Sequence, residues 1–134
     1  MYYYYVPFAY ENGFSQCQVV RNSPITHQKE IEEIRNQISE TYSNNNSAVS
    51  ILNYILLREQ DEVIVNNKEN KRKYYYFVSY LYNNGIAFGN TEFISNKPIS
   101  TINQVKLLAE RIEEEHFKSK YSVFITNFIL LRTE

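Results

Sequence analysis

Hydrophobic and polar positions change period in a fixed order along the chain, and the same order occurs in each half. Each half begins with a stretch rich in tyrosine and valine, Tyr2–Tyr10 and Tyr74–Tyr82, which is typical of a β-strand. Asn-Gly follows each stretch, and because this pair accepts positive φ at low cost it predicts a hairpin turn. The expected return strands are Phe14–Val20 and Phe88–Ile94.

Helical spacing replaces the strand pattern after each return strand. A Pro-Ile pair ends the strand, since proline cannot donate to a ladder, and an apolar stripe among charged residues follows. The spacing predicts helices over His27–Tyr42 and Ile102–Phe117. Thr101 and Gln104 have the spacing of a capping box, which places the start of the second helix.

A third strand is expected to close each half, over Val49–Arg58 and Val123–Arg132, where aliphatic residues alternate with other types. The stretch Glu62–Val65 favours a short additional strand.

The two halves resemble each other in sequence. YYYYVPFAYENG matches YYYFVSYLYNNG, and VSILNYILLR matches VFITNFILLR without a gap, with two extra residues after Gly85 in the second half. We therefore predict a tandem duplication in one domain, with repeats over 1–59 and 74–134 and a linker over 60–73. The expected fold class is α+β, a mostly antiparallel sheet with two helices on one face.

Composition narrows the classes of function. The chain has 134 residues, of which 43% are hydrophobic and 22% charged, as in globular proteins rather than disordered ones. A formal net charge of −1 argues against general nucleic-acid binding. No stretch is long and apolar enough for a membrane span, and the N-terminus lacks the pattern of a secretory signal. The single cysteine excludes an intramolecular disulfide and fits a reducing cytoplasm, our expected location.

No known catalytic motif occurs in the sequence. A glycine-rich phosphate loop, a paired-cysteine motif, a zinc-protease motif and a nucleophile elbow are all absent. His27 and His116 fall at helix ends, where caps and dipole partners are common, and Cys17 falls in a strand as a small buried residue. We therefore predict no catalytic residue, no metal site and no cofactor.

Asn53 and Asn127 occupy equivalent places in the two closing strands. Strict alternation places each amide on the same face as four aliphatic residues. A buried amide without a partner costs about 1–3 kcal/mol, so each needs a hydrogen-bond partner. Backbone at a bulge and a polar ligand between the repeats are the two alternatives.

The second hairpin differs from the first and carries the run Phe88-Gly89-Asn90. Glycine beside an aromatic residue lets backbone amides approach a flat ligand while the ring stacks on it. The alternative is a hairpin with a glycine bulge. Phe14 is the counterpart of Phe88 in the first repeat.

The second half resembles small phage and prophage proteins of low-GC bacteria, and in particular anti-defence sponges such as the Thoeris anti-defence proteins. The resemblance rests on three segments, YYYFVSYLYNNGIAFGNTEF, KPISTINQVKLLAERI and VFITNFILL.

The resemblance implies a non-catalytic protein that sequesters a signalling nucleotide, of the cyclic ADP-ribose or cyclic dinucleotide type, to counter bacterial anti-phage immunity. It implies a closed pocket at a dimer-like interface and leaves open a further homo-oligomer. Aromatic rings would stack, amides and the glycine backbone would hydrogen-bond, and arginines would meet phosphate. The implied ligand-binding residues are Phe14, Asn53, Phe88, Gly89, Asn90, Arg111, Asn127 and Arg132. The alternative is a protein-interaction inhibitor of a host defence or regulatory protein; an enzyme that degrades the signal is a third reading.

Overall fold

The computed structural model describes residues 1–11, 13–42, 48–59 and 72–134. It forms two compact units, Met1–Glu59 and Gln60–Glu134, each with a hairpin, a helix and closing strands in that order. The short strand predicted over Glu62–Val65 lies outside the described residues, as does most of the predicted linker.

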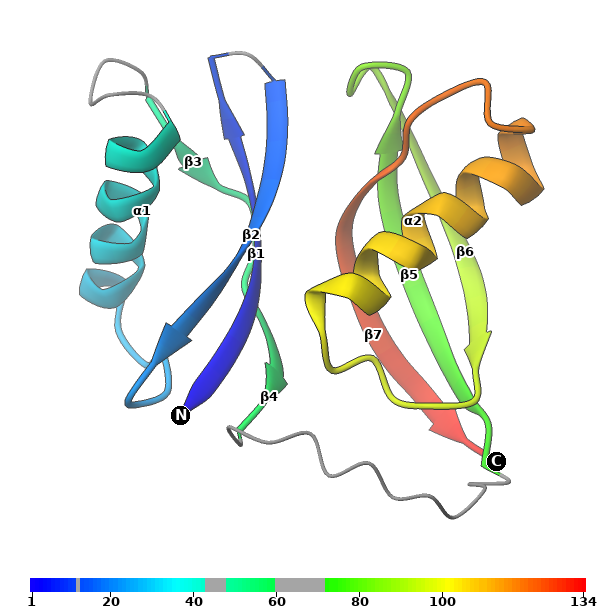
Figure 1. Cartoon of the computed structure of the whole chain (residues 1–134), viewed down its shortest axis with the longest axis horizontal. Coiled ribbons are helices and arrows are strands. Elements are labelled where there is room, and N and C mark those ends of the chain that lie inside the picture. Colours follow the sequence, from blue (N-terminus) through cyan, green and yellow to red (C-terminus); the bar gives the residue numbers. More distant parts are fainter. Residues whose placement is uncertain (12, 43–47, 60–71) are drawn as a thin grey trace. The chain divides into compact units, whose positions relative to one another are not determined.

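Unit 1 is a small antiparallel sheet with one helix on one face (Figure 1). Its central strand β1 pairs with β2 on one side and with the short strands β3 and β4 on the other. The helix α1 follows β2 and covers the sheet with Ile34 and Ile38. The elements are β1 (Tyr2–Tyr10), β2 (Gly13–Arg21), α1 (Gln28–Tyr42), β3 (Ser50–Ile51) and β4 (Ile55–Arg58).

Unit 2 has the same order of elements, with one long closing strand in place of two short ones. Its sheet has the order β6-β5-β7, all antiparallel, and α2 lies on one face (Figure 1). The elements are β5 (Tyr74–Tyr82), β6 (Ala87–Ser95), α2 (Ile102–Phe117) and β7 (Phe124–Thr133).

The α+β class, the two helices and the antiparallel pairing are confirmed, but the strands form two sheets instead of the single sheet that we expected. The reason is that each closing strand pairs with the first strand of its own unit. Both sides of β1 and of β5 are thereby hydrogen-bonded locally.

The second hairpin turn and the cap of α2 form at the residues that the sequence predicted. The second hairpin turn holds Asn83, Asn84 and Gly85 at φ values of 54°, 57° and 81°, which asparagine and glycine tolerate. Thr101 caps α2 in a capping box with Gln104, as predicted.

Both units use a strand tyrosine to hold the start of the segment that leads into the helix. The hydroxyl of Tyr4 accepts a hydrogen bond from the backbone N–H of Ile25 at 3.0 Å, and that of Tyr76 accepts one from Ile99 at 2.9 Å. These residues follow the prolines that end the return strands, so one contact fixes the turn from sheet to helix in each unit.

The closing strands are less regular than alternation predicted. In unit 1 the strand is interrupted between Ile51 and Ile55, and in unit 2 the register of β7 shifts twice against β5. One shift lies at Thr126, so Ile125 and Phe128 are buried while Asn127 is not. The prediction that Asn127 shares a face with all four aliphatic residues is therefore wrong. The extra residue places it on the face opposite to Ile125, although it still shares a face with Ile129.

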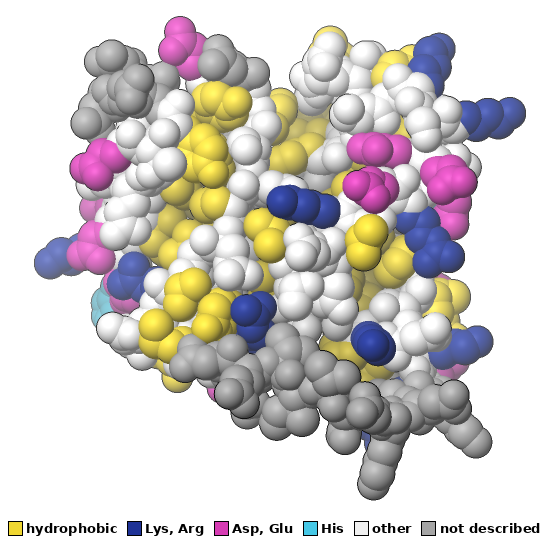
Figure 2. All heavy atoms as spheres, in the orientation of Figure 1, with side chains coloured by type: hydrophobic (Ala, Val, Ile, Leu, Met, Phe, Trp, Pro, Cys, Tyr) yellow, Lys and Arg dark blue, Asp and Glu magenta, His cyan; other side chains and the backbone are white. Residues whose placement is uncertain are grey.

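The helices of both units expose charged side chains on their outer sides. Figure 2 shows carboxylate and basic groups over the outward face of α2, while the inward face buries Val105, Leu108 and Ile112. Among the residues that the structure describes, no helix has the length and apolar character needed to cross a membrane.

Candidate functional site

Four of the eight predicted ligand-binding residues lie on one face of the sheet of unit 2. The ring of Tyr80 packs against Phe117 of α2, with ring centroids 6.2 Å apart, which identifies the face toward the helix. Residues next to Tyr80 along β5, such as Ser79, point to the other face, which we call the helix-free face. Cross-strand partners share a face, so this face carries Phe88, Asn90, Asn127 and Arg132.

The helix-free face is built from rows of three residues that cross the sheet. Asn90, Ser79 and Asn127 are directly opposite one another and form a polar row. Apolar side chains flank this row, among them Phe88, which is 79% exposed, and Ile129, which is 50% exposed.

Arg132 closes this face at the end of the strands. Its guanidinium lies 3.9 Å from the ring centroid of Tyr75 and 3.6 Å from a carboxylate oxygen of Glu92. Unit 1 has the same stacked pair, with Arg58 over Tyr3 at 3.9 Å. The recurrence of this pair at strand ends indicates a structural role in each sheet.

Gly89 and Arg111 lie on the other side of the sheet of unit 2. Gly89 pairs with Tyr80 in a ladder that continues through it without a shift, so the glycine-bulge interpretation is wrong. A Cβ at this position would lie 2.5 Å from the Tyr80 ring, which explains why the strand has glycine here. Arg111 projects from α2.

Phe14 and Asn53 belong to unit 1. Phe14 lies in β2 opposite Ala9 and is 38% exposed. Asn53 lies in the interruption between β3 and β4, where its Oδ1 accepts a hydrogen bond from the backbone N–H of Tyr54 at 2.9 Å. This partner agrees with the first of the two alternatives for Asn53, a hydrogen bond to backbone.

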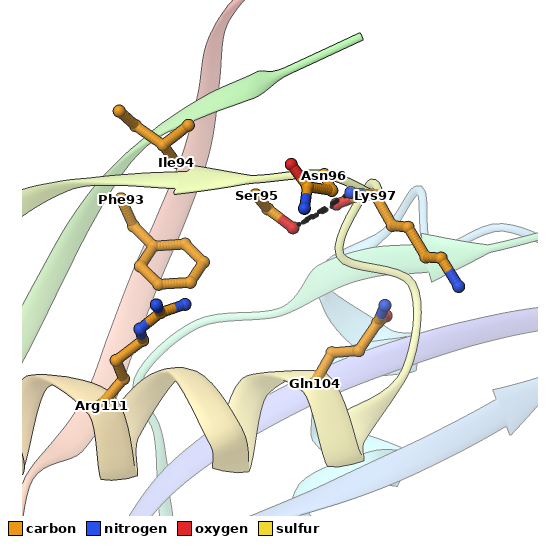
Figure 3. A pocket seen from close by; sticks show the side chains of 7 residues that line it. All are labelled: Phe93, Ile94, Ser95, Asn96, Lys97, Gln104 and Arg111. Atoms are coloured by element: carbon orange, nitrogen blue, oxygen red, sulfur yellow. Dashed lines mark hydrogen bonds between the residues drawn. The ribbon is translucent and has the colours of Figure 1, made fainter. Parts of the chain in front are cut away.

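A cavity of about 340 Å³ opens between the end of β6 and α2 in unit 2 (Figure 3). Phe93 points from β6 toward the helix, and Arg111 and Gln104 point back toward the strand. The guanidinium carbon of Arg111 lies 5.7 Å from the Phe93 ring centroid. The lining residues are Phe93, Ile94, Ser95, Asn96, Lys97, Gln104 and Arg111.

The hydrogen bonds around this cavity leave donors directed at it. The Oε1 atom of Gln104 accepts from the backbone of Ser100 and Thr101 in the capping box, so the amide keeps its NH₂ group for other partners. The Ser95 hydroxyl donates a hydrogen bond to the carbonyl oxygen of Lys97 and accepts one from its backbone N–H, and these two bonds shape the turn at the rim. The charged groups at the rim are the cations of Lys97 and Arg111, and Arg111 also approaches Glu115 at 3.4 Å.

Unit 1 has an ion-pair cluster at the corresponding positions. Arg21, the counterpart of Ser95, lies 3.6 Å from carboxylate oxygens of both Glu30 and Glu33. Desolvation opposes ionisation of Glu30, but hydrogen bonds from Thr26 and the neighbouring Arg21 hold its pKa below the ordinary value. In unit 2 the two carboxylates are replaced by Gln104 and Leu107, so cations face an open cavity there.

Sequence reasoning found Arg111 but missed Phe93, Lys97 and Gln104 as its neighbours. In the sequence, Gln104 has the spacing of a helix cap and Phe93 that of an ordinary strand residue. The useful signal was the comparison of the two halves, in which an Arg-Glu-Glu set in the first corresponds to Ser-Gln-Leu in the second.

Comparisons of the chain with models of protein families, with curated proteins and with solved structures found no match. Within the described part of the chain, no group of three or more His, Cys, Asp or Glu side chains is placed to hold a metal ion.

Proposed function

We propose that unit 2 binds a small anionic ligand with a planar ring, of the nucleotide class, in the cavity between β6 and α2. One observation carries this proposal: where unit 1 has the Arg21 ion-pair cluster, unit 2 has a cavity lined by Phe93, Lys97 and Arg111.

The lining chemistry suits a nucleotide. Arginine and lysine bind phosphate by charge-assisted hydrogen bonds, and an amide NH₂ group adds neutral donors. The Phe93 ring offers a face or edge for a base, with Arg111 beside it. A volume of about 340 Å³ is at the lower end for small-molecule sites, which favours a compact nucleotide over a cyclic dinucleotide.

The proposed role is sequestration of the ligand without chemical change, in the bacterial cytoplasm. The setting of anti-phage immunity rests on the resemblance described above. The cavity supports a binding role because its polar side chains, among them Lys97, Gln104 and Arg111, are of the kinds that hydrogen-bond phosphate groups and bases.

A capture-and-release experiment tests the proposal. The full chain is incubated with AMP, ADP-ribose, cyclic ADP-ribose isomers and cyclic dinucleotides, separated by filtration, heated and chromatographed. We expect one compact nucleotide to be depleted before heating and recovered intact after it. Full recovery of every nucleotide in the first filtrate would contradict the proposal, and a new product would contradict the sequestering role.

A matched pair of variants locates the site. Arg111→Ala removes a charged hydrogen-bond donor, worth about 1.5–3 kcal/mol, so we expect at least about tenfold weaker binding by calorimetry. Arg35→Ala removes an exposed arginine from α1 of unit 1 and is expected to bind as the native chain does. Equal affinities for both variants would exclude this cavity.

Exposed apolar residues on the helix-free face favour a second candidate function, the inhibition of a protein partner. Phe88, Ile94 and Ile129 are 79%, 48% and 50% exposed on this face. A defined partner protein whose binding survives Arg111→Ala but is lost with Ile129→Asp would support it. Loss of that binding with both variants would argue against this face as the contact.

A further inference from the structure

Strand β6 lies at one edge of the three-stranded sheet of unit 2. It pairs with β5 over all nine residues from Ala87 to Ser95 without a register shift, and it has no second neighbour among the described strands. An edge strand of this length presents a row of backbone N–H and C=O groups that can pair with another strand.

Several devices that protect an edge strand are missing from β6. Its sequence, AFGNTEFIS, has no proline, lysine or arginine, its ladder has no bulge, and Glu92 is its single charged residue. By contrast β7, at the other edge of the same sheet, has two register shifts against β5. The free edge of β6 is therefore the one suited to strand addition.

We propose that β6 pairs with β6 of a second copy of this chain, antiparallel and related by a twofold axis at Thr91. In this register two residues of the two copies face each other when their residue numbers add to twice 91, as those of Asn90 and Glu92 do. The two sheets then form one continuous sheet of six strands, with both α2 helices on the same face.

The side-chain pairs produced by this register are complementary. On the helix-free face Phe88 meets Ile94 of the second copy, and these side chains are 79% and 48% exposed in one chain. On the other face Phe93 of the second copy stands opposite Gly89, beside the Tyr80 ring that occupies the space next to this glycine. Thr91 meets its own copy, a favourable cross-strand pair.

Neighbouring registers are worse. A twofold axis at Glu92 would place two carboxylates directly opposite, which is destabilising. An axis at Asn90 would place Phe88 opposite Glu92, and an axis at Phe93 would place Ile94 opposite Glu92. Of these four registers, the one with its axis at Thr91 pairs the large apolar residues Phe88 and Ile94 and places Glu92 opposite the neutral Asn90. This match favours β6 of a second copy as the partner strand.

The association state of the full chain gives the first test. We expect sedimentation velocity and light scattering to show a concentration-dependent species of twice the 16.0 kDa chain mass. A native chain that stays monomeric at the highest soluble concentration would overturn the proposal.

Cysteine cross-linking tests the register, in a Cys17→Ala background. Directly opposite residues have Cα atoms about 4.5–5.5 Å apart, within disulfide range, so Thr91→Cys should cross-link to itself. Phe88→Cys should not, because the two copies would be about 20 Å apart, but it should cross-link when mixed with Ile94→Cys. A dimer without the Thr91→Cys cross-link, or with a Phe88→Cys self-link, would overturn the register.

A matched pair of surface variants separates edge pairing from general stickiness. Phe88→Lys should give a monomer, whereas Ile86→Lys, which removes a 76% exposed side chain from the turn outside β6, should leave the dimer intact. Circular dichroism on both variants controls for folding. Dissociation by both variants, or by neither, would show that β6 is not the interface.

Discussion

At the residue scale, glycine is required at position 89 by a neighbouring ring and not by the turn beside it. Gly89 lies inside a regular strand, and its missing side chain leaves space for the end of the Tyr80 ring. Tyr80 has little freedom to move, because its ring also packs against Tyr82 and Phe117. The glycine is thus part of the packing of the core under α2.

We predict that Gly89→Ala destabilises unit 2. Alanine would gain about 0.5–1 kcal/mol over glycine in a strand, but overpacking costs typically about 1–3 kcal/mol, and a contact of 2.5 Å places this site in that class. Urea unfolding should therefore show a net loss of about 1 kcal/mol.

The Tyr80→Leu background is the control for this prediction, because it removes the far end of the ring. There the same Gly89→Ala change should stabilise by about 0.5–1 kcal/mol, which gives a coupling energy of about 1.5–2 kcal/mol in a double-mutant cycle. Equal losses in both backgrounds would mean that the ring is not the cause.

Cys17 is predicted to react slowly with alkylating agents. Burial raises the pKa of this thiol from 9.0 to about 11, and the thiolate is the reactive form. At about pH 8 the native chain should react with iodoacetamide about a hundredfold more slowly than the chain in guanidinium chloride. Equal rates would show that the thiol is accessible and has an ordinary pKa.

Several of these residues could be predicted from sequence and others could not. Thr101 and Gln104 follow a local rule for helix starts, so their roles were found. For Gly89 the sequence offers a ligand contact or a bulge, and the bulge alternative is wrong because the constraint comes from Tyr80, a residue on the neighbouring strand.

At the scale of elements, the first strand of each unit does more than pair with its neighbours. The hydroxyls of Tyr4 and Tyr76 bind the backbone just before the helix, so a strand, a turn and a helix are fixed together. The tyrosine ring also packs edge-on against the closing strand region, Tyr4 on Tyr54 and Tyr76 on Phe128. Tyrosine serves here where phenylalanine would leave a backbone donor unpaired.

We predict that Tyr76→Phe costs more stability than Tyr4→Phe. Ile99 is 8% exposed, so its N–H group would lose its partner in a buried place, at about 1–3 kcal/mol. Ile25 is half-buried, and water can replace part of its lost hydrogen bond. Unfolding curves of the two variants measure the difference; a larger loss for Tyr4→Phe would contradict this account.

The closing strands show how far a pattern predicts an element. Alternation correctly located a strand in each half, but it predicted one straight strand where the chain has an interruption in unit 1 and two register shifts in unit 2. A bulge changes which side chains are buried without changing the composition, so alternation alone does not reveal it.

At the scale of the whole molecule, buried phenols make stability depend on alkaline pH. Burial raises the pKa of Tyr5, Tyr76 and Tyr80, and that of the Cys17 thiol, above their values in the unfolded chain. A group whose pKa is higher in the folded chain than in the unfolded chain stabilises the fold. This contribution is present in full below the pKa of the unfolded chain, which is about 10 for tyrosine. It is lost as the pH rises toward the pKa of the folded chain.

We therefore predict that the chain loses at least about 1 kcal/mol of stability between about pH 8 and about pH 11, since each unit of pKa difference is worth about 1.4 kcal/mol. Urea unfolding at the two pH values measures this loss. In Tyr5→Phe the loss should be smaller, because one titrating group is removed. A stability that does not change over this range would contradict the burial of these hydroxyls.

The cavity and the free edge of β6 belong to the same unit but make separate predictions. Nucleotide capture is tested by Arg111→Ala on α2, and dimerisation by Phe88→Lys on the other face of the sheet. A chain that binds a nucleotide as a monomer, or dimerises without a ligand, would separate the two proposals cleanly.

The sequence by itself determined the elements, because strands, turns, prolines and caps depend on residues close together in the chain. It located both helices nearly to the residue, the hairpin turns and the α+β class. Tertiary structure decided what depends on residues far apart: that the strands form two sheets, that Gly89 serves Tyr80, and that Asn127 turns away from the core at a bulge. It also decided that Arg111 faces Phe93 across a cavity, because only packing brings a helix residue and a strand residue together.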